Sequence, residues 1–327
     1  MRSIRRGGGV AAALLLFVSV PAPAADLRAR LRRPTRGIQV RVTPVTIPAR
    51  SEREVCEIVT LGNRRAVDVS EITAVTPSRP TAVTHHLAIF DYEGGGPVDV
   101  PRGVPFDSVG CLGVGGQEVS PILAFVQQPR QTIRFPPHVG LRVPPAQRVM
   151  LNLHYINSGP EPVTVDAAVN LRAARRGALT HHVRSFQLGT LNIFVPPGKS
   201  GSATRTWTTP FPMNLVWLST HSHKHTQSVD VDLVRQGIVG GEVLGTVRYS
   251  EPTVQTYADP LRLDAGDGFH WTCDYQNDTG VPLTFGVTSN GEMCFTVGFF
   301  CPDIDDAPLP AVPGCFGDGD GLVCPEN

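Results

Sequence analysis

Five histidines and one methionine give this chain the chemistry of a copper site. They are His85, His86, His154, His221, His223 and Met293. The first and the last lie 208 residues apart (293 − 85). Imidazole nitrogens combined with one soft thioether sulfur suit copper that cycles between Cu(I) and Cu(II), and few other roles need both. The set of six therefore predicts copper redox chemistry.

The adjacent pair His85-His86 can bind one ion only where its strand is irregular. Neighbouring residues of a regular strand point to opposite faces, so both rings reach one metal only if the strand begins, ends or bulges there. The structural alternative is one buried and one exposed histidine. A third nitrogen must come from elsewhere. His154, which follows the apolar run 151–153, is the candidate, although alone it fits a core or edge histidine equally well.

The segment 220–225 carries a stronger signal, because His221 and His223 are two positions apart. Residues with this spacing share one face of a strand and can chelate one ion while the residue between them points away. The overlapping alternative pairs His223 with His225, and the structural alternative is a polar, exposed strand end. Met293, in the segment 291–294, would by itself be interpreted as core filling.

The elements that must position these residues are short strands. Thirty-three Gly and 30 Pro interrupt runs rich in Val, Thr, Leu and Phe, and no long stretch keeps a helical apolar period. Segments 39–42, 149–153, 215–218 and 229–233 have the pattern of strands between turns. The sequence predicts an all-β chain of two antiparallel, jelly-roll-like β-sandwich domains in tandem. We expect these domains over residues 36–172 and 178–302, joined near the basic, Ala-rich stretch 171–179, with an Asp/Pro/Gly-rich tail over 303–327.

The first 24 residues have the layout of a secretory signal. Three arginines precede the apolar run 10–20, which is too short to span a membrane, and the small residues Ala22-Pro23-Ala24 follow. We expect a periplasmic or secreted protein without membrane insertion. Twenty-nine basic and 29 acidic residues cancel, so no strong field favours nucleic acid or an anionic membrane. Only two of the 29 basic residues are lysines, which indicates the codon bias of a GC-rich, bacterial genome.

Seven cysteines in an exported chain favour disulfides, and the odd number leaves at least one outside them. A bond between Cys273 and Cys294 would close a loop of about 20 residues, contribute ~3 kcal/mol and fix the backbone next to Met293. The other pairings that we expect are Cys56 with Cys111 and, in the tail, Cys315 with Cys324, leaving Cys301 over. Motifs of zinc proteases, α/β-hydrolases and phosphate-binding loops are absent from the sequence.

The sequence around the six residues resembles the copper type II, ascorbate-dependent monooxygenases, which include peptidylglycine alpha-hydroxylating monooxygenase and dopamine beta-monooxygenase. The matching stretches are His85-His86-Leu87, the segment from Phe135-Pro136-Pro137 to Leu153-His154-Tyr155, His221-Ser222-His223 and Glu292-Met293-Cys294. No one of them is specific alone. Their order and spacing together are specific, and the matching stretches extend over most of the mature chain.

The resemblance implies two β-sandwich domains that each carry one copper beside a cleft. By the resemblance, His85, His86 and His154 hold an electron-transfer copper. His221, His223 and Met293 hold the copper that activates oxygen and are the catalytic residues. The disulfide between Cys273 and Cys294 occupies the place of a family disulfide. Reduced by ascorbate or a similar electron donor, such enzymes cleave dioxygen and insert one oxygen atom into an unactivated C–H bond of a small organic substrate.

Two positions depart from the pattern of the peptide-hydroxylating members. These carry an arginine two residues before the His-x-His pair and a tyrosine four residues after the methionine, where this chain has Ser219 and Val297. Peptide amidation is therefore not expected. The remaining histidines are interpreted as structural or exposed: His138, His181, His182 and His270. The alternative functions are an exported copper-binding protein of the same fold without oxygenase activity and an exported structural β-sandwich.

Overall fold

The computed structural model describes residues 25–92, 102–112, 121–302 and 321–324. The expected signal sequence 1–24 and residues 303–320 and 325–327 of the expected tail lie outside these residues. The prediction of an all-β chain is confirmed, because the described residues form strands and a single 3₁₀ turn, η1 (Val109–Cys111). No helix in this part of the chain is long and apolar enough to cross a membrane.

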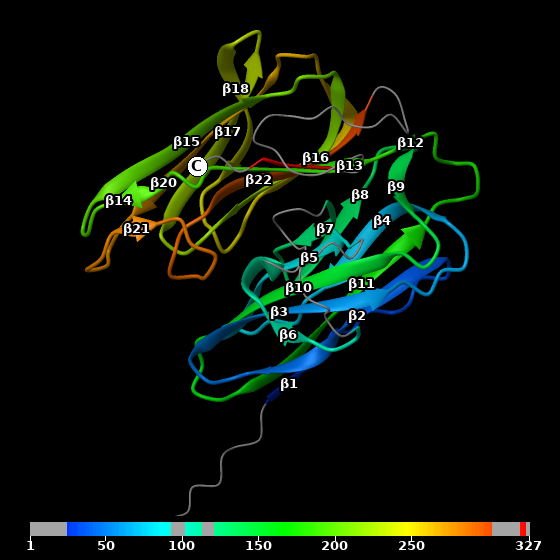
Figure 1. Ribbon diagram of the computed structural model, residues 1–327, viewed down its shortest axis with the longest axis horizontal. Helices are drawn as coiled ribbons and strands as arrows, with labels where there is room; N and C mark the ends of the chain where they lie inside the picture. The colour runs from blue at the N-terminus through cyan, green and yellow to red at the C-terminus, as the bar shows by residue number, and fades with distance from the viewer. Residues whose placement is uncertain (1–24, 93–101, 113–120, 303–320, 325–327) are drawn as a thin grey trace, which may run out of the picture.

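Strands from the first half of the chain form two sheets, which occupy the lower part of Figure 1. The seven-stranded sheet contains β1 (Ala25–Leu27), β2 (Gly37–Ile47), β4 (Val67–Val75), β8 (Arg130–Arg134), β9 (Val139–Val143), β11 (Val163–Ala173) and β12 (His181–His182). The five-stranded sheet has the order β6 (Phe106–Asp107), β3 (Ser51–Thr60), β10 (Arg148–Asn157), β5 (Ala82–Asp91) and β7 (Ile122–Val126). We call these two the N-terminal sheets.

Strands from the second half form the C-terminal sheets, in the upper part of Figure 1. One has the order β19 (Val254–Leu263), β16 (Met213–Ser222), β22 (Cys294–Pro302), β13 (Arg184–Gly189) and β23 (Gly321–Cys324). The other has the order β15 (Ser200–Thr208), β20 (Gly268–Gln276), β17 (Thr226–Arg235) and β18 (Ile238–Thr246). A short ribbon joins β14 (Phe194–Val195) to β21 (Leu283–Thr284).

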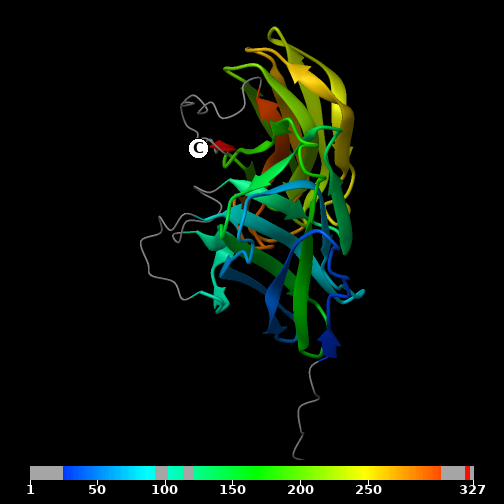
Figure 2. The ribbon, with the colours of Figure 1, turned by 90° about the vertical axis from the view of Figure 1, so that its right-hand side faces the viewer.

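Strands β16 and β22 are buried along almost their whole length. A strand with one covered face alternates buried and exposed residues, so continuous burial means that both faces are covered. One face of β16 places Leu215 and Leu218 in an apolar core among the C-terminal sheets. Its Trp217, with Phe299 of β22, belongs instead to the core that fills the N-terminal sheets. The two groups of sheets are therefore held together by an apolar interface, and Figure 2 shows them one above the other.

The four segments expected to be strands lie within β2, β10, β16 and β17. Strand β11 continues to Ala173, the third residue of the stretch 171–179 in which we expect the two domains to be joined. Strand β12 pairs with β9 of the N-terminal sheets, so the C-terminal sheets begin with β13 at Arg184.

Disulfide bonds join Cys56 to Cys111 and Cys273 to Cys294, the two pairings expected outside the tail. Cys324 is also disulfide-bonded, and its expected partner Cys315 lies outside the described residues. Cys301 is buried on β22, within the apolar interface between the two groups of sheets. Disulfides are typical of an oxidising compartment.

Candidate metal centre

The five predicted histidines form one cluster at the interface between the N-terminal and C-terminal sheets. The rings of His85 and His221 lie 4.9 Å apart between centroids, and those of His85 and His223 lie 5.0 Å apart. We call His85, His86 and His154 the N-terminal group and His221 and His223 the C-terminal group. Within the N-terminal group, the ring centroids of His86 and His154 lie 5.3 Å apart. All five side chains are buried, with exposed fractions from 1% to 8%. The resemblance implied a cleft between two separate triads, but here the histidines of the two triads are in contact.

A β-bulge brings His85 and His86 to the same site. His154 of β10 pairs directly with His86 of β5, whereas the next residue, Tyr155, pairs with Thr84. His85 is therefore the extra residue of the bulge, which turns its ring toward the face that carries His86. This is the irregularity that two adjacent ligands require.

In the N-terminal group, neighbouring side chains hold the Nε2 atoms of two rings. Asn152 donates its amide N–H to Glu54 Oε1 at 2.8 Å, so its Oδ1 faces His86 Nε2 at 2.7 Å and accepts the proton there. His154 Nε2 lies 3.1 Å from the Glu52 carboxylate. In both rings, Nδ1 is the nitrogen that no hydrogen bond from the described residues holds.

In the C-terminal group, neighbouring residues hold the Nδ1 atoms of the rings rather than the Nε2 atoms. His221, on β16, lies with Nδ1 2.7 Å from Gln127 Oε1, and the amide of Gln127 donates to the carbonyl oxygen of Thr220. His223, one residue beyond the end of β16, donates from Nδ1 to the carbonyl oxygen of Gly291 at 3.0 Å. The Nε2 atoms of both rings are left with the lone pair, in contrast to the Nδ1 atoms of His86 and His154.

The unbonded ring nitrogens fit a metal ion. Four of them are buried without a hydrogen-bond partner among the described residues: His85 Nε2, His86 Nδ1, His154 Nδ1 and His223 Nε2. Each unmade hydrogen bond costs about 1–3 kcal/mol, which a bound metal would offset. Nitrogens of His85, His86 and His221 lie within 4.8 Å of one another. Glu54, His86 and His154 form a second such group.

Burial keeps the imidazoles of His85, His221 and His223 neutral. It lowers the pKa of His85 and of His221 well below the ordinary value, and the neighbouring rings add to the effect. Burial also lowers the pKa of His223 to about 4. The hydrogen bond from His154 lowers the pKa of Glu52 to about 2 against the opposing effect of burial. The site therefore presents neutral nitrogens beside an ionised carboxylate at neutral pH, the protonation state that metal ligation needs.

Met293 is buried in the segment between β21 and β22, directly before Cys294 of the disulfide. It belongs to neither of the two apolar cores. Its carbonyl oxygen accepts a hydrogen bond from Tyr275, and the preceding Glu292 accepts backbone N–H groups from His223 and His225. The backbone of Met293 is thereby fixed next to His223. The role of Met293 as a ligand stays a prediction.

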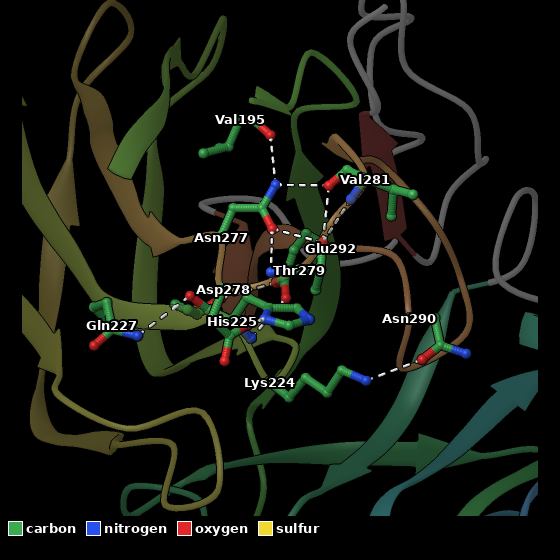
Figure 3. A network of polar contacts seen from close by, with 11 residues as sticks. Val195, Lys224, His225, Gln227, Asn277, Asp278, Thr279, Val281, Asn290 and Glu292 are labelled. Carbon is green, nitrogen blue, oxygen red and sulfur yellow. Dashed lines mark hydrogen bonds and ion pairs between the residues drawn. The ribbon is translucent and has the colours of Figure 1, made fainter. Parts of the chain in front are cut away.

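His225 does not join the cluster. Figure 3 shows its ring beside Asp278, and His225 Nδ1 lies 3.0 Å from that carboxylate. The neighbouring Asn277 is fully buried and donates to the carbonyl oxygens of Val195 and Val281 (Figure 3). His225 thus belongs to a structural network of the C-terminal sheets, and the geometry favours His221 with His223 over the alternative pair.

The other four histidines also lie outside the cluster. His138 and His270 bond to Ala178 O and Thr206 Oγ1, respectively. His181 is exposed on β12, and His182, half-buried on the same strand, lies 3.5 Å from the Asp68 carboxylate.

Sequence reasoning missed the residues that orient the ligands. Glu52 and Glu54 lie two positions apart on β3, where Glu54 pairs directly with His154 of β10. Their spacing on a strand could have indicated two carboxylates on one face. Gln127 carries no such signal, because it contacts His221 only through the packing of one group of sheets on the other.

A narrow cavity of about 20 Å³ lies between the two histidine groups. Polar walls are supplied by His86, Asn152 and His221, and apolar walls by Phe125, Phe295 and Val297. This volume holds about one water molecule. The five rings are themselves shielded from bulk water, since each histidine is at most 8% exposed.

The family model described as copper type II ascorbate-dependent monooxygenase, C-terminal domain, matches residues 188–307. The match covers 120 residues (307 − 188 + 1), somewhat more than a third of the chain. The matched domain contains His221, His223 and Met293 together with both cysteines of the Cys273–Cys294 disulfide. The resemblance predicted from the sequence is confirmed for this copper monooxygenase domain. The three histidines of the N-terminal group precede it.

A search of curated proteins gave no match. Among solved structures, the major capsid protein P2 of bacteriophage PM2 is 7% identical, with a TM-score of 0.32 over 81% of this chain and 100% of that one. The structure of Broad Bean Stain Virus is 10% identical, with a TM-score of 0.32 over 94% and 98%. Scores this low carry no argument about function.

Proposed function

We propose that the protein is a copper-dependent monooxygenase that hydroxylates an unactivated C–H bond of a small organic molecule. Dioxygen is the oxidant and ascorbate or a similar molecule is the reductant. The observation that carries the proposal is the cluster of five buried histidines, whose C-terminal members lie in a domain of the copper monooxygenase family.

The proposed protein binds two coppers. His85, His86 and His154 hold the electron-transfer copper, and His221, His223 and Met293 hold the copper that meets dioxygen. A bound copper pair supplies one-electron transfer and dioxygen activation, and a soft thioether ligand stabilises the Cu(I) state that reacts with dioxygen. His86 and His154 present Nδ1, whereas His221 and His223 present Nε2, and this difference supports a division into two sites.

The chain's own residues prepare the site in three ways. Burial keeps the rings of His85, His221 and His223 neutral, so their lone pairs are available at neutral pH. Gln127, Asn152 and Glu52 fix ring orientation through the opposite nitrogens. The apolar interface beside the cluster excludes water, which would otherwise compete for the ligand positions and promote side reactions.

The substrate that we propose is small and is not a peptide carboxylate. Ser219 is buried and donates to the carbonyl oxygen of Thr253, and Val297 lies in the apolar interface. Neither residue offers the positive charge or the phenol with which peptide-hydroxylating relatives grip a carboxylate. The apolar side chains Phe295 and Val297 at the cavity favour a substrate with hydrocarbon groups next to the reacting carbon.

The second candidate is an exported copper-binding protein of the same fold that performs no oxygen chemistry. The difference between the two ligand sets, three histidines in one and two histidines with Met293 in the other, favours the enzyme, because a carrier has little need of two chemically different coppers. The disulfides support a periplasmic or secreted location for either candidate.

Metal analysis and oxygen uptake by the purified protein distinguish the candidates. Two coppers per chain, with oxygen uptake that depends on ascorbate and yields a hydroxylated product in a substrate screen, are expected for the monooxygenase. One labile copper without oxygen uptake would establish the copper-binding alternative. A protein that binds no copper would contradict both.

A further inference from the structure

A second cavity, open to solvent, lies on the outer face of the seven-stranded sheet. On β4 and β11, Ile72 and Leu171 point into the core of the N-terminal sheets. Adjacent residues of a strand point to opposite faces, so Glu71 and Arg172 lie on the outer face, where both line the cavity. Its volume is about 380 Å³, within the range of small-molecule sites. The three histidines of the N-terminal group lie on β5 and β10 of the five-stranded sheet, so the cavity is separate from the metal centre.

An arginine-rich segment, residues 28–36, forms one wall of this cavity and contains five arginines. Polar side chains of β11 hold its backbone on the sheet. Asn170 donates its side-chain N–H to the carbonyl oxygen of Arg32 at 2.8 Å, and Asp166 accepts the backbone N–H of Ala29 at 2.6 Å. Both Asn170 and Asp166 are only 8% exposed. The arginine side chains of this wall therefore project from a fixed backbone.

The side chains that line the cavity carry four positive charges and one negative charge. The positive charges belong to Arg30, Arg32, Arg130 and Arg172. The negative charge is that of Glu71, which lies 2.8 Å from Arg134 Nε and 3.7 Å from Arg172 Nη1. Arg30, Arg32 and Arg130 are exposed and form no ion pair within the described part of the chain. The lining of the cavity thus has a net charge of +3 (4 − 1).

The charge of this cavity suits a ligand with two phosphate groups. Like charges around one cavity repel one another, and a bound anion with several charges offsets the repulsion. Each phosphate ester carries about −1.5 to −2 charges at pH 7, so two of them balance the charge of the lining. The planar guanidinium fork also matches phosphate, to which it donates two parallel hydrogen bonds. A membrane fits less well, because a flat array of headgroups meets only the rim of a concave site.

We infer that this cavity binds a small, soluble organic bisphosphate. Arg30 and Arg32 of the wall hold one phosphate, and Arg130 and Arg172 of the sheet hold the other. The inference does not depend on the proposed oxygenase activity, because the cavity shares no residue with the metal centre.

Calorimetric titration of the full-length mature protein with fructose bisphosphate tests the site, and fructose monophosphate is the reference ligand. We expect the bisphosphate to bind at least about tenfold more tightly, the order of one additional charge-assisted contact. Its affinity should fall as the NaCl concentration rises. The double variant Arg32→Gln, Arg130→Gln removes one arginine from each pair and should weaken bisphosphate binding at least about tenfold.

The matched control is the double variant Arg64→Gln, Arg65→Gln. These two arginines are exposed between β3 and β4 and lie outside the cavity. The control therefore removes the same charge and should keep the bisphosphate affinity within about twofold. All four arginines are on the surface, so both variants should unfold at the temperature of the unchanged protein. Added bisphosphate should raise the unfolding temperature of the unchanged protein and of the control, but not of the cavity variant.

Absence of bisphosphate binding, or equal affinity for the two sugar phosphates, would overturn the inference. So would bisphosphate binding that is unaffected in the cavity variant, or an equal loss in the cavity variant and the control. Sedimentation with phosphatidylglycerol vesicles tests the competing partner. The protein should stay in the supernatant, whereas sedimentation that the cavity variant loses would identify a membrane surface as the partner and would also overturn the inference.

Discussion

Gln127 Oε1 lies 2.7 Å from His221 Nδ1, across the boundary between the N-terminal and C-terminal sheets. The reverse connection also exists, because the backbone N–H of Ser289 donates to the Glu52 oxygen that accepts from His154. Each histidine group is thus oriented in part by the other half of the molecule. Ligand geometry at either site therefore depends on the packing of the sheets as well as on the strand that carries the ligands.

The first prediction concerns Gln127. Gln127→Leu should weaken copper binding at the His221 and His223 site by about 10–100-fold, because His221 loses the acceptor that orients its ring. Competition with a Cu(I) chelator measures the change. Gln127→Glu keeps an acceptor at the same place and should retain most of the affinity.

The control for Gln127 is its neighbour Gln128, whose amide lies 3.5 Å from the carbonyl oxygen of Pro252 and contacts no histidine. Gln128→Leu should leave the Cu(I) affinity unchanged. Equal losses in the Gln127→Leu and Gln128→Leu variants would mean that the effect comes from disturbed packing at the end of β7, and the orienting role of Gln127 would be rejected.

The second prediction concerns Met293. Met293→His should keep copper binding but largely abolish turnover, since a third imidazole removes the soft ligand that stabilises Cu(I). Copper content and ascorbate-dependent oxygen uptake give the two readings. Met213, buried in the core of the C-terminal sheets, supplies the control, and Met213→Leu should retain both. Hydroxylation at the unchanged rate by Met293→His would refute the assignment of the oxygen site.

Much of the fold could be predicted because strand identity is a local property. The alternation of apolar residues in segments such as 229–233 identifies a strand without reference to its partners. The bulge at His85 and His86 followed from a geometric requirement, once both rings were assumed to bind one ion. The contact between the two histidine groups could not be predicted in this way. It depends on the docking of Trp217 and Phe299 on the N-terminal sheets, and one sequence does not indicate which surfaces meet.

The third prediction concerns the two disulfides. Replacing both Cys273 and Cys294 by Ser should lower the free energy of unfolding by about 3 kcal/mol, because the bond spans 21 residues, and the 55-residue span of Cys56–Cys111 should contribute about 4 kcal/mol. Denaturant titration measures both. Only removal of the Cys273–Cys294 bond frees the backbone beside Met293, so this variant should also bind Cu(I) more weakly. An equal loss of Cu(I) affinity on removal of either disulfide would contradict this link between the bond and the site.

The fourth prediction concerns the pH dependence of metal-free protein. Burial lowers the pKa of His85, His221 and His223, so the unfolded chain takes up these protons first as the pH falls through the ordinary value of 6.5. The free energy of unfolding should therefore decrease from pH 6.5 toward pH 4, and His223 alone should account for about 3 kcal/mol of this decrease.

Glu292 acts in the opposite direction. Burial raises its pKa from 4.5 to about 7, so between these values the folded protein holds the proton that the unfolded chain has released. As the pH falls over this range, protonation of Glu292 in the folded protein raises the free energy of unfolding. This increase offsets part of the decrease that the three histidines cause. Glu292→Gln removes this offset, and denaturant titrations at pH 7.5, 6 and 5 should show a steeper loss than in the unchanged protein. A shallower loss in the variant would mean that Glu292 is ionised in the folded state throughout this range, held by the N–H groups of His223 and His225.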